Sequence, residues 1–120
     1  MLQKILGLLG YHRQEAKPAE ARSPKWPALE KAHLLKEPAC VACGGTTHLE
    51  AHHIIPFHVD SSKELDPTNL ITLCRHPSHD DHFIWGHFCD FKAWNPNVRE
   101  DASEYHEKMK NRQTKRDREY

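Results

Sequence analysis

The sequence carries no net charge and no long apolar run, and each absence excludes a class of protein. Its 17 lysine and arginine residues are balanced by 17 aspartate and glutamate residues in a chain of 120. This balance argues against a protein that grips nucleic acid over its whole surface by bulk positive charge. No stretch approaches the roughly 20 apolar residues of a membrane-spanning helix, so we expect no membrane partner. We also expect no nucleotide cofactor.

The sequence also lacks the pattern of a secretion signal. The apolar run near its start is too short, and no small-residue cleavage site follows it closely. We therefore expect a cytoplasmic protein, in which cysteines stay reduced and paired cysteines indicate metal or redox chemistry. Leucine and isoleucine at helical spacing in this first segment predict either a short amphipathic turn docked on the body or a frayed terminus.

What the sequence has in excess is histidine. It contains 11 histidines and four cysteines, and histidine is the commonest metal ligand as well as the side chain that titrates near neutrality. Most of the histidines and most of the acidic residues lie within residues 32–101, between two basic ends. Such an acidic centre would repel phosphate unless cations occupied it, so the pattern itself argues for bound metal.

Length and turn residues predict one domain flanked by tails. Residues 1–23 are typical of an N-terminal tail and linker, 24–112 form the expected domain, and 113–120 form a charged C-terminal tail. Hydrophobic periodicity and capping residues predict five elements within the domain. They are a helix from about residue 23, capped by Ser23 and ended by Pro38, strands over 47–55 and 70–74, a short helix over about 80–88, and a helix that follows its cap Asn97 and frays after Asn111.

The segment Cys40-Val-Ala-Cys43-Gly-Gly has the form of a zinc knuckle. Two thiolates three positions apart can bind one tetrahedral ion, and the glycines let the backbone turn tightly around it. Cys74 is the obvious third ligand, and the fourth stays open between His79 and Asp81. The alternative is that Cys74 and Cys89 are buried and act only as small hydrophobic residues. Two other residues lie in range of the same ion, namely His76 and Cys89.

Three further motifs follow in order along the chain. They are Leu49-Glu-Ala-His-His-Ile-Ile-Pro56, Asn69-Leu-Ile-Thr-Leu-Cys74 and Asp81-His-Phe-Ile-Trp-Gly-His87. With Cys-x2-Cys before them and Phe-x-x-Trp-Asn-Pro after them, they make residues 24–102 resemble the HNH endonucleases, the ββα-metal nucleases of phage, restriction, homing and colicin-type enzymes. The resemblance implies an α+β fold, with a small ββα-metal (His-Me finger) motif, flanking helices and a structural zinc.

The resemblance also assigns roles to individual residues. His53 matches the general base that activates water, and Asn69 matches the asparagine that braces the motif's loop and fixes the orientation of that base. His52 and His82 match ligands of a catalytic divalent ion, which is magnesium, manganese or another metal. His87 is a candidate further ligand of the same ion.

This sequence departs from the family pattern at one position. In many relatives a cysteine directly precedes the late histidine and closes the zinc site, whereas here that position holds Asp81. The zinc therefore has Asp81 or a shifted His79 as its fourth ligand, or the zinc site is degraded.

The chemistry of the residues points to the same function. Phosphodiester hydrolysis needs a base to take a proton from water and a divalent ion to stabilise the charge that builds on the phosphate and leaving oxygens. Adjacent residues on a strand point to opposite faces, so His52 and His53 can divide these roles. We expect a metal-dependent endonuclease that cuts DNA with weak sequence specificity. Basic residues that would contact the backbone, each also typical of a solvated surface, are Lys25, Lys31, Lys108, Lys110 and Arg112.

Two other functions stay open. A catalytically inactive, zinc-stabilised module would bind nucleic acid without cleaving it, but a purely structural site would not need His53, Asn69 and His82 together. A RING-like interaction domain fits poorly because a second Cys pair is missing. For a nuclease, the biological setting stays open among phage packaging, restriction, homing and defence.

Overall fold

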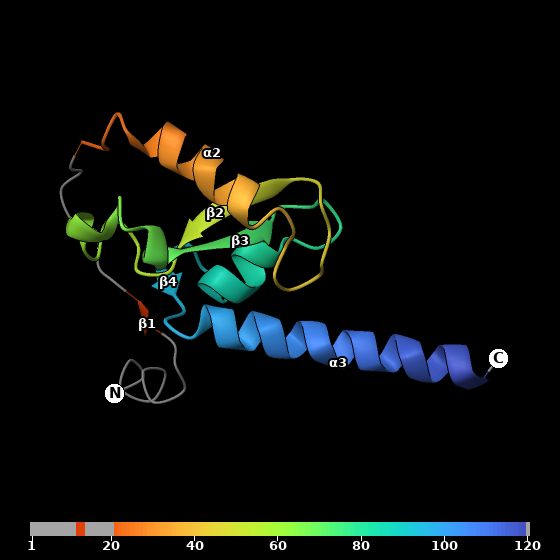
Figure 1. Cartoon of the computed structure of the whole chain (residues 1–120). Coiled ribbons are helices and arrows are strands. Elements are labelled where there is room, and N and C mark those ends of the chain that lie inside the picture. The colour runs from red at the N-terminus through yellow and green to blue at the C-terminus, as the bar shows by residue number, and fades with distance from the viewer. Residues whose placement is uncertain (1–11, 14–20, 120) are drawn as a thin grey trace, which may run out of the picture.

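The computed structural model of the protein describes residues 12–13 and 21–119, and it has a small antiparallel sheet between helices (Figure 1). The predicted amphipathic turn near the N-terminus lies outside these residues. Mixed helix and strand confirm the predicted α+β class. In chain order the elements are β1 (His12–Arg13), α2 (Trp26–Lys36), β2 (Leu49–His53), η1 (Ser61–Lys63), η2 (Pro67–Asn69), β3 (Leu70–Cys74), η3 (His82–Gly86), β4 (Ala93–Trp94) and α3 (Val98–Glu119).

The central sheet consists of β2 and β3, which pair so that His52 lies opposite Ile71 and His53 opposite Leu70. Every residue of β3 is buried, as expected for an apolar, partly β-branched strand with elements on both sides. Helix α2 covers one side of the sheet, while η3 and the first turns of α3 lie on the other (Figure 1). Both predicted strands are present, although β2 begins two residues later and ends two residues earlier than the sequence indicates.

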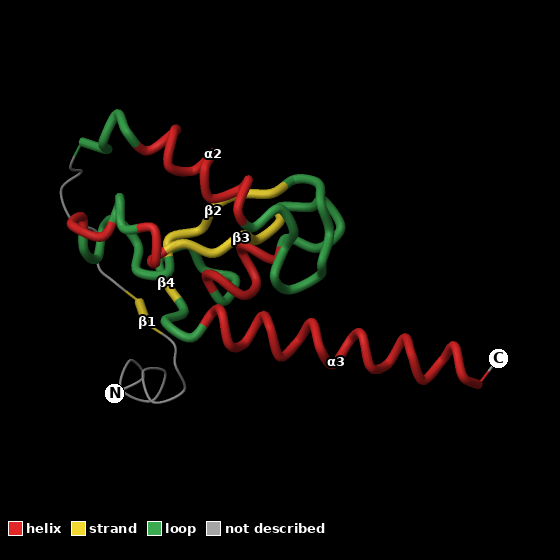
Figure 2. Tube along the Cα trace, in the orientation of Figure 1, coloured by secondary structure: helices red, strands yellow, loops and turns green. Residues whose placement is uncertain are grey.

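The loop between the two strands is long and carries two short helical turns, η1 and η2 (Figure 2). Asp60 begins the first turn and accepts a hydrogen bond from the main-chain nitrogen of Ser62, and Asp66 begins the second and accepts one from Thr68. These caps satisfy main-chain donors that the short turns leave unpaired. The loop is therefore ordered by its own side chains. This order matters because the loop brings the first residue of β3 opposite the last residue of β2.

The apolar core is small and includes two of the cysteines. It lies between β3, the knuckle after α2 and the first turns of α3. Val98 and Ala102, one helical turn apart, are the buried positions through which α3 joins this core. The remaining buried members of this cluster are Cys40, Ala42, Ile71, Leu73 and Cys74.

The helices differ from expectation at their ends. Helix α2 begins at Trp26 rather than near Ser23, because Ser23 Oγ and O instead close a turn onto the main-chain nitrogens of Lys25 and Trp26. Pro27 falls in the first helical turn, where its missing N–H costs nothing. No residue of α2 is fully buried, so the face that this helix turns to the sheet is only partly covered.

Helix α3 begins at Val98 as predicted but continues to Glu119, without the fraying expected after Asn111. Its outer half projects beyond the rest of the chain (Figure 1). Contacts at i,i+4 spacing support this part, including a hydrogen bond from Gln113 to Asp117. Among the described residues, no helix is long and apolar enough to cross a membrane. Strand β1 also falls within the segment predicted to be a linker.

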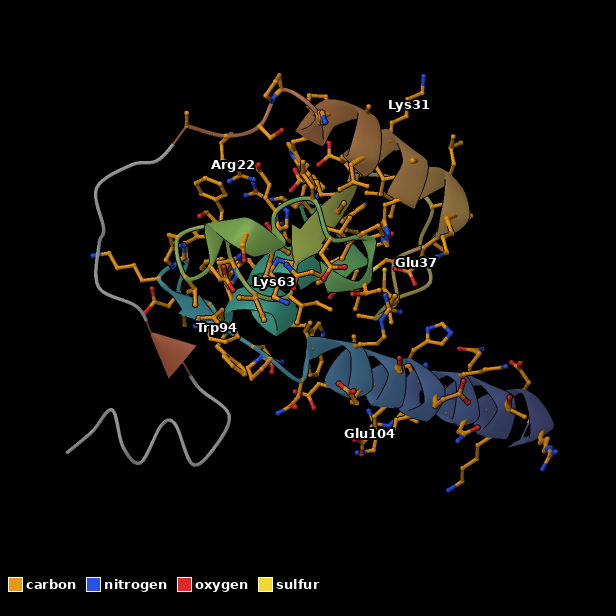
Figure 3. All side chains as sticks on the ribbon, turned by 60° about the vertical axis from the view of Figure 1, so that its left-hand side comes forward. Arg22, Lys31, Glu37, Lys63, Trp94 and Glu104 are labelled. Atoms are coloured by element: carbon orange, nitrogen blue, oxygen red, sulfur yellow. The ribbon has the colours of Figure 1, made fainter. Side chains whose placement is uncertain are left out.

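Glu37, at the end of α2, joins three elements (Figure 3). Its carboxylate accepts hydrogen bonds from the main-chain nitrogen of Thr72 on β3, at 2.7 Å, and from both terminal nitrogens of Arg99 on α3. Its carbonyl oxygen accepts the hydroxyl of Thr72 at 2.7 Å. Burial alone raises the pKa of the Glu37 carboxyl, but the hydrogen bonds from Arg99 and Thr72 outweigh this effect and leave the pKa below its ordinary value.

Replacing Glu37 by glutamine should lower the free energy of unfolding by about 1 kcal/mol at pH 7, because the charge that Arg99 faces is lost. This difference in the free energy of unfolding should have its full size above the unfolded carboxyl pKa of roughly 4.3. It should vanish as pH falls through the lowered pKa of Glu37 in the folded protein. Urea unfolding at several pH values measures it. Glu104→Gln, which removes an exposed ion pair with Lys108, should change stability by only a few tenths of a kcal/mol. Equal effects of the two variants would contradict this account.

Candidate metal centres

The first cluster consists of three thiols and a carboxylate. Cys40 and Cys43 come from the knuckle after α2, Cys74 ends β3, and Asp81 directly precedes η3. Their ligand atoms all lie within 4.8 Å of one another. Asp81 Oδ2 lies 3.4 Å from Cys40 Sγ and 3.3 Å from Cys74 Sγ, and Cys43 Sγ lies 3.8 Å from Cys74 Sγ.

These separations fit a tetrahedral ion. Ligands about 2.0–2.3 Å from such an ion lie roughly 3.3–3.8 Å from each other. Burial raises the pKa of the Cys40 and Cys43 thiols, so a cation is needed for these sulfurs to exist as thiolates beside a carboxylate. The donor set of three sulfurs and one oxygen matches what zinc accepts in proteins.

The ring of His79 lies apart from this cluster. Its Nδ1 faces the hydroxyl of Ser78 at 2.8 Å, and the ring stacks on His76 with 4.6 Å between centroids. Only its main-chain oxygen approaches the cluster, accepting the thiol of Cys74 at 3.5 Å. The turn after β3 therefore brings Asp81, which is 4% exposed, to the position that the sequence left open between these two residues.

The second cluster consists of three imidazoles. His52 lies on β2, His82 begins η3 and His87 follows it. One ring nitrogen of each lies within 4.8 Å of the others, and the two Nε2 atoms of His82 and His87 are 3.3 Å apart. His52 is 3% exposed, and its Nε2 is buried without a hydrogen-bond partner among the described residues.

In His82 and His87 the other ring nitrogen, Nδ1, lies against a hydrogen-bond acceptor. His87 Nδ1 lies 2.8 Å from the carbonyl oxygen of Ala93, and His82 Nδ1 lies 3.0 Å from a carboxylate oxygen of Glu50. Each Nδ1 must donate its proton there, which leaves Nε2 with a lone pair directed at the centre of the cluster. A hydrogen-bond acceptor behind the ring is typical of histidines that bind metal.

Burial lowers the pKa of all three rings, His52 furthest. The rings are therefore neutral, which is the form that binds metal. Two lone pairs 3.3 Å apart beside the unpartnered Nε2 of His52 are unfavourable unless a cation lies between them. The residues present thus fit a divalent ion.

The geometry of η3 explains how His82 and His87 meet. They are five residues apart, a spacing that puts side chains on different faces of an α-helix. The element that links them is π-helical over His82–Gly86, with a wider turn in which residues five apart come into line. The sequence predicts a short helix here, and the structure adds the turn type on which the convergence depends.

His53 has a separate environment on the other side of β2. Its Nε2 lies 3.0 Å from the carbonyl oxygen of Glu64, to which it donates, so Nδ1 is left as the proton acceptor. Its ring lies against the indole of Trp26, with 4.3 Å between centroids. Burial lowers the pKa of His53, and the charge of Arg22 adds to this effect. The ring is neutral near pH 7, as a general base must be.

Asn69 holds the two ends of the loop between β2 and β3 together. Its side-chain oxygen accepts the main-chain N–H of Ile55 at 2.8 Å, and its amide group donates to the carbonyl oxygens of Ile55 and Lys63. Asn69 is 6% exposed, so these bonds are shielded from water. The side chain thereby fixes the loop segment whose Glu64 carbonyl orients His53.

All four histidines line one pocket between α2, β2 and η3. Three residues that the sequence reasoning missed belong to this site: Glu50, Arg22 and Gly86. Glu50 could have been found, because it lies two positions before His52 and hence on the same strand face. Arg22 carries no such signal, since it lies in a segment typical of a linker.

The five basic residues expected to contact DNA are exposed, but they do not form one surface. Two lie at or on α2 and three on α3, and Figure 3 shows Lys31 and Glu104 on opposite sides of the molecule. Lys108 is paired with Glu104 one turn away, at 3.0 Å. Their contact with DNA stays a prediction.

Two antiparallel strands followed by a short helix, with histidines from strand and helix converging, define a ββα-metal type of site. Residues 40–76 match the family model described as HNH endonuclease, which confirms the resemblance over that segment. The matched segment contains the first two thiols, both histidines of β2, Asn69 and Cys74. Neither the curated proteins nor the solved structures include a match to the chain.

Gly86→Ala should weaken metal binding at the histidine cluster. A Cβ at this position would lie 3.0 Å from both Cε1 and Nε2 of His52, and that ring is too buried to move away freely. We expect roughly 10-fold weaker binding of Mn²⁺, measured by titration calorimetry on zinc-loaded protein. Absorption of the thiolate site after cobalt substitution should be unchanged and serves as the control. Unaltered Mn²⁺ affinity would show that the cluster does not bind the ion.

Asp81→Asn should weaken zinc binding roughly 10-fold or more, because it removes an anionic ligand from the thiol cluster. Thiolate absorption of the cobalt-substituted protein during competition with a chelator reports this site and not the histidine cluster. Asp80→Asn is the matched control, since its carboxylate pairs with Arg75 instead, and it should bind metal normally. Normal binding by Asp81→Asn together with loss in His79→Ala would refute Asp81 as the ligand.

Proposed function

We propose that the protein is a metal-dependent HNH endonuclease that hydrolyses phosphodiester bonds of DNA. The observation that carries this proposal is the meeting of three neutral imidazoles beside a separately oriented fourth in one pocket. The match of residues 40–76 to the HNH endonuclease family supports it.

His53 would act as the general base. Its Nε2 proton is engaged by the carbonyl oxygen of Glu64, so Nδ1 is available to take a proton from an attacking water. Packing against Trp26 restricts rotation of the ring. Asn69 contributes indirectly, because it holds the loop that carries the Glu64 carbonyl. A base that is neutral at working pH and fixed in one tautomer meets the requirements for proton abstraction.

His52, His82 and His87 would hold the catalytic divalent ion, magnesium, manganese or another metal. Such an ion stabilises negative charge on the phosphate oxygens and the leaving oxygen. Glu50 and the Ala93 carbonyl keep two of these rings in the tautomer that exposes Nε2. Cys40, Cys43, Cys74 and Asp81 would hold a structural zinc that joins the knuckle to the end of β3 and the start of η3.

DNA is the proposed substrate, and its backbone rather than its bases would be the main contact. Lys25 and Lys31 lie at the start and along the outer face of α2, the helix that borders the pocket. Lys108, Lys110 and Arg112 lie on α3 and would reach more distant phosphates. Because contacts of this kind carry no sequence information, we expect weak sequence specificity.

Nicking of supercoiled plasmid tests the proposal. With Mg²⁺ or Mn²⁺, His53→Ala should lower the rate by about 10²–10⁴-fold, which is the usual contribution of a general base. His48→Asn is the matched control, because His48 is exposed on a left-handed backbone that asparagine accepts; its rate should be that of the wild type. An unchanged rate in His53→Ala would contradict the mechanism. Zinc content and DNA retention without cleavage by the wild type would favour the inactive binding module.

A further inference from the structure

Arg22, which lies on the segment before α2 (Figure 3), borders the same pocket and is held in place by the buried carboxylate of Glu64. Its Nε donates to Glu64 Oε2 at 2.6 Å, and the side chain of Glu64 is 5% exposed whereas that of Arg22 is 49% exposed. The other carboxylate oxygen accepts the main-chain nitrogen of Ser23 at 2.9 Å. Both oxygens of Glu64 are thus used to fasten the segment before α2.

Two aromatic rings lie close to the guanidinium of Arg22. Its central carbon lies 4.5 Å from the ring centroid of Phe57 and 5.9 Å from that of Trp26. Such cation–π contacts are favourable for arginine and restrict its movement. Among the hydrogen bonds of the described residues, Arg22 donates through Nε alone. The terminal nitrogens therefore remain as donors on a side chain that is already oriented.

The charge of the pocket makes this arrangement significant. Among the described residues that line it, Arg22 is the one with a permanent positive charge, and Glu30 adds a negative one. An anionic substrate needs cationic partners, and the planar fork of arginine matches the oxygens of phosphate. An arginine that served only to neutralise Glu64 would not need its outer half exposed at this pocket.

We propose that Arg22 binds the phosphate of the substrate in this pocket, with Glu64 as the positioning residue. This inference rests on the proposed function. Glu64 fixes Arg22 through its side chain and His53 through its main-chain oxygen, 3.0 Å from Nε2. The separation between the phosphate-binding group and the general base is therefore set by a single residue of the loop that Asn69 braces.

Salt dependence of DNA binding tests the contact without requiring cleavage. In a His53→Ala background, a duplex oligonucleotide is titrated at several salt concentrations and binding is followed by fluorescence anisotropy. Loss of one phosphate contact in Arg22→Ala should reduce the slope of log K against log salt by about 0.9. Arg22→Lys keeps the charge and should keep most of the slope.

Arg99→Ala is the matched control, because it also removes an arginine paired with a glutamate, Glu37, but lies outside the pocket. Its salt slope should equal that of the parent protein. In the wild-type background, Arg22→Ala should lower the nicking rate per folded molecule by roughly 10²–10³-fold, and Arg22→Lys should restore only part of it, since it lacks the fork. Glu64→Gln should give a smaller loss than Arg22→Ala.

Equal slopes and equal rates for Arg22→Ala and Arg99→Ala would overturn the inference and reduce Arg22 to a structural ion pair. The two proposals fail in different ways. If the wild type does not nick DNA but the slope still falls in Arg22→Ala, the proposed function is wrong and Arg22 still binds phosphate. If the wild type nicks and neither slope nor rate depends on Arg22, only the present inference is wrong.

Discussion

A buried imidazole nitrogen, Nε2 of His52, has no hydrogen-bond partner among the described residues, and it is the constraint on which the centre of this molecule depends. Leaving a polar atom unpaired in a protein interior is costly, and the surrounding structure directs two further lone pairs toward it instead of a donor. Gly86 supplies the space for the His52 ring, since a Cβ there would lie 3.0 Å away. The π-helical turn and the register of β2 against β3 also help to bring the three imidazoles together.

The loop between the strands supplies the second half of the site. Its Glu64 contributes a carbonyl oxygen to His53 and a carboxylate to Arg22, and Asn69 holds the loop by bonds to Ile55 and Lys63. The base is thus positioned from the loop, while the three other histidines are positioned from β2 and η3. Two independent parts of the chain meet at β2, where adjacent side chains point to opposite faces.

The sequence alone predicts the strands and the main histidines, because these follow from local pattern. An apolar, partly β-branched run predicts β3, and the resemblance to the HNH endonucleases singles out His52, His53 and Asn69. The sequence does not decide between Asp81 and His79 as the fourth zinc ligand, because both lie within reach of the thiols along the chain. The backbone turn after β3 determines which side chain faces the cluster. The sequence misses Arg22 because a linker-like segment gives no local signal. Periodicity over so few residues predicts a helix at 80–88 but not its π-helical form.

The central claim is that the three imidazoles form one metal site beside His53. Crystals soaked in Mn²⁺ and measured for anomalous scattering at the manganese edge test it most directly. We predict a peak within coordination distance of His52, His82 and His87, with His53 unligated. A peak that involves His53, or manganese elsewhere in the molecule with none among these rings, would contradict it.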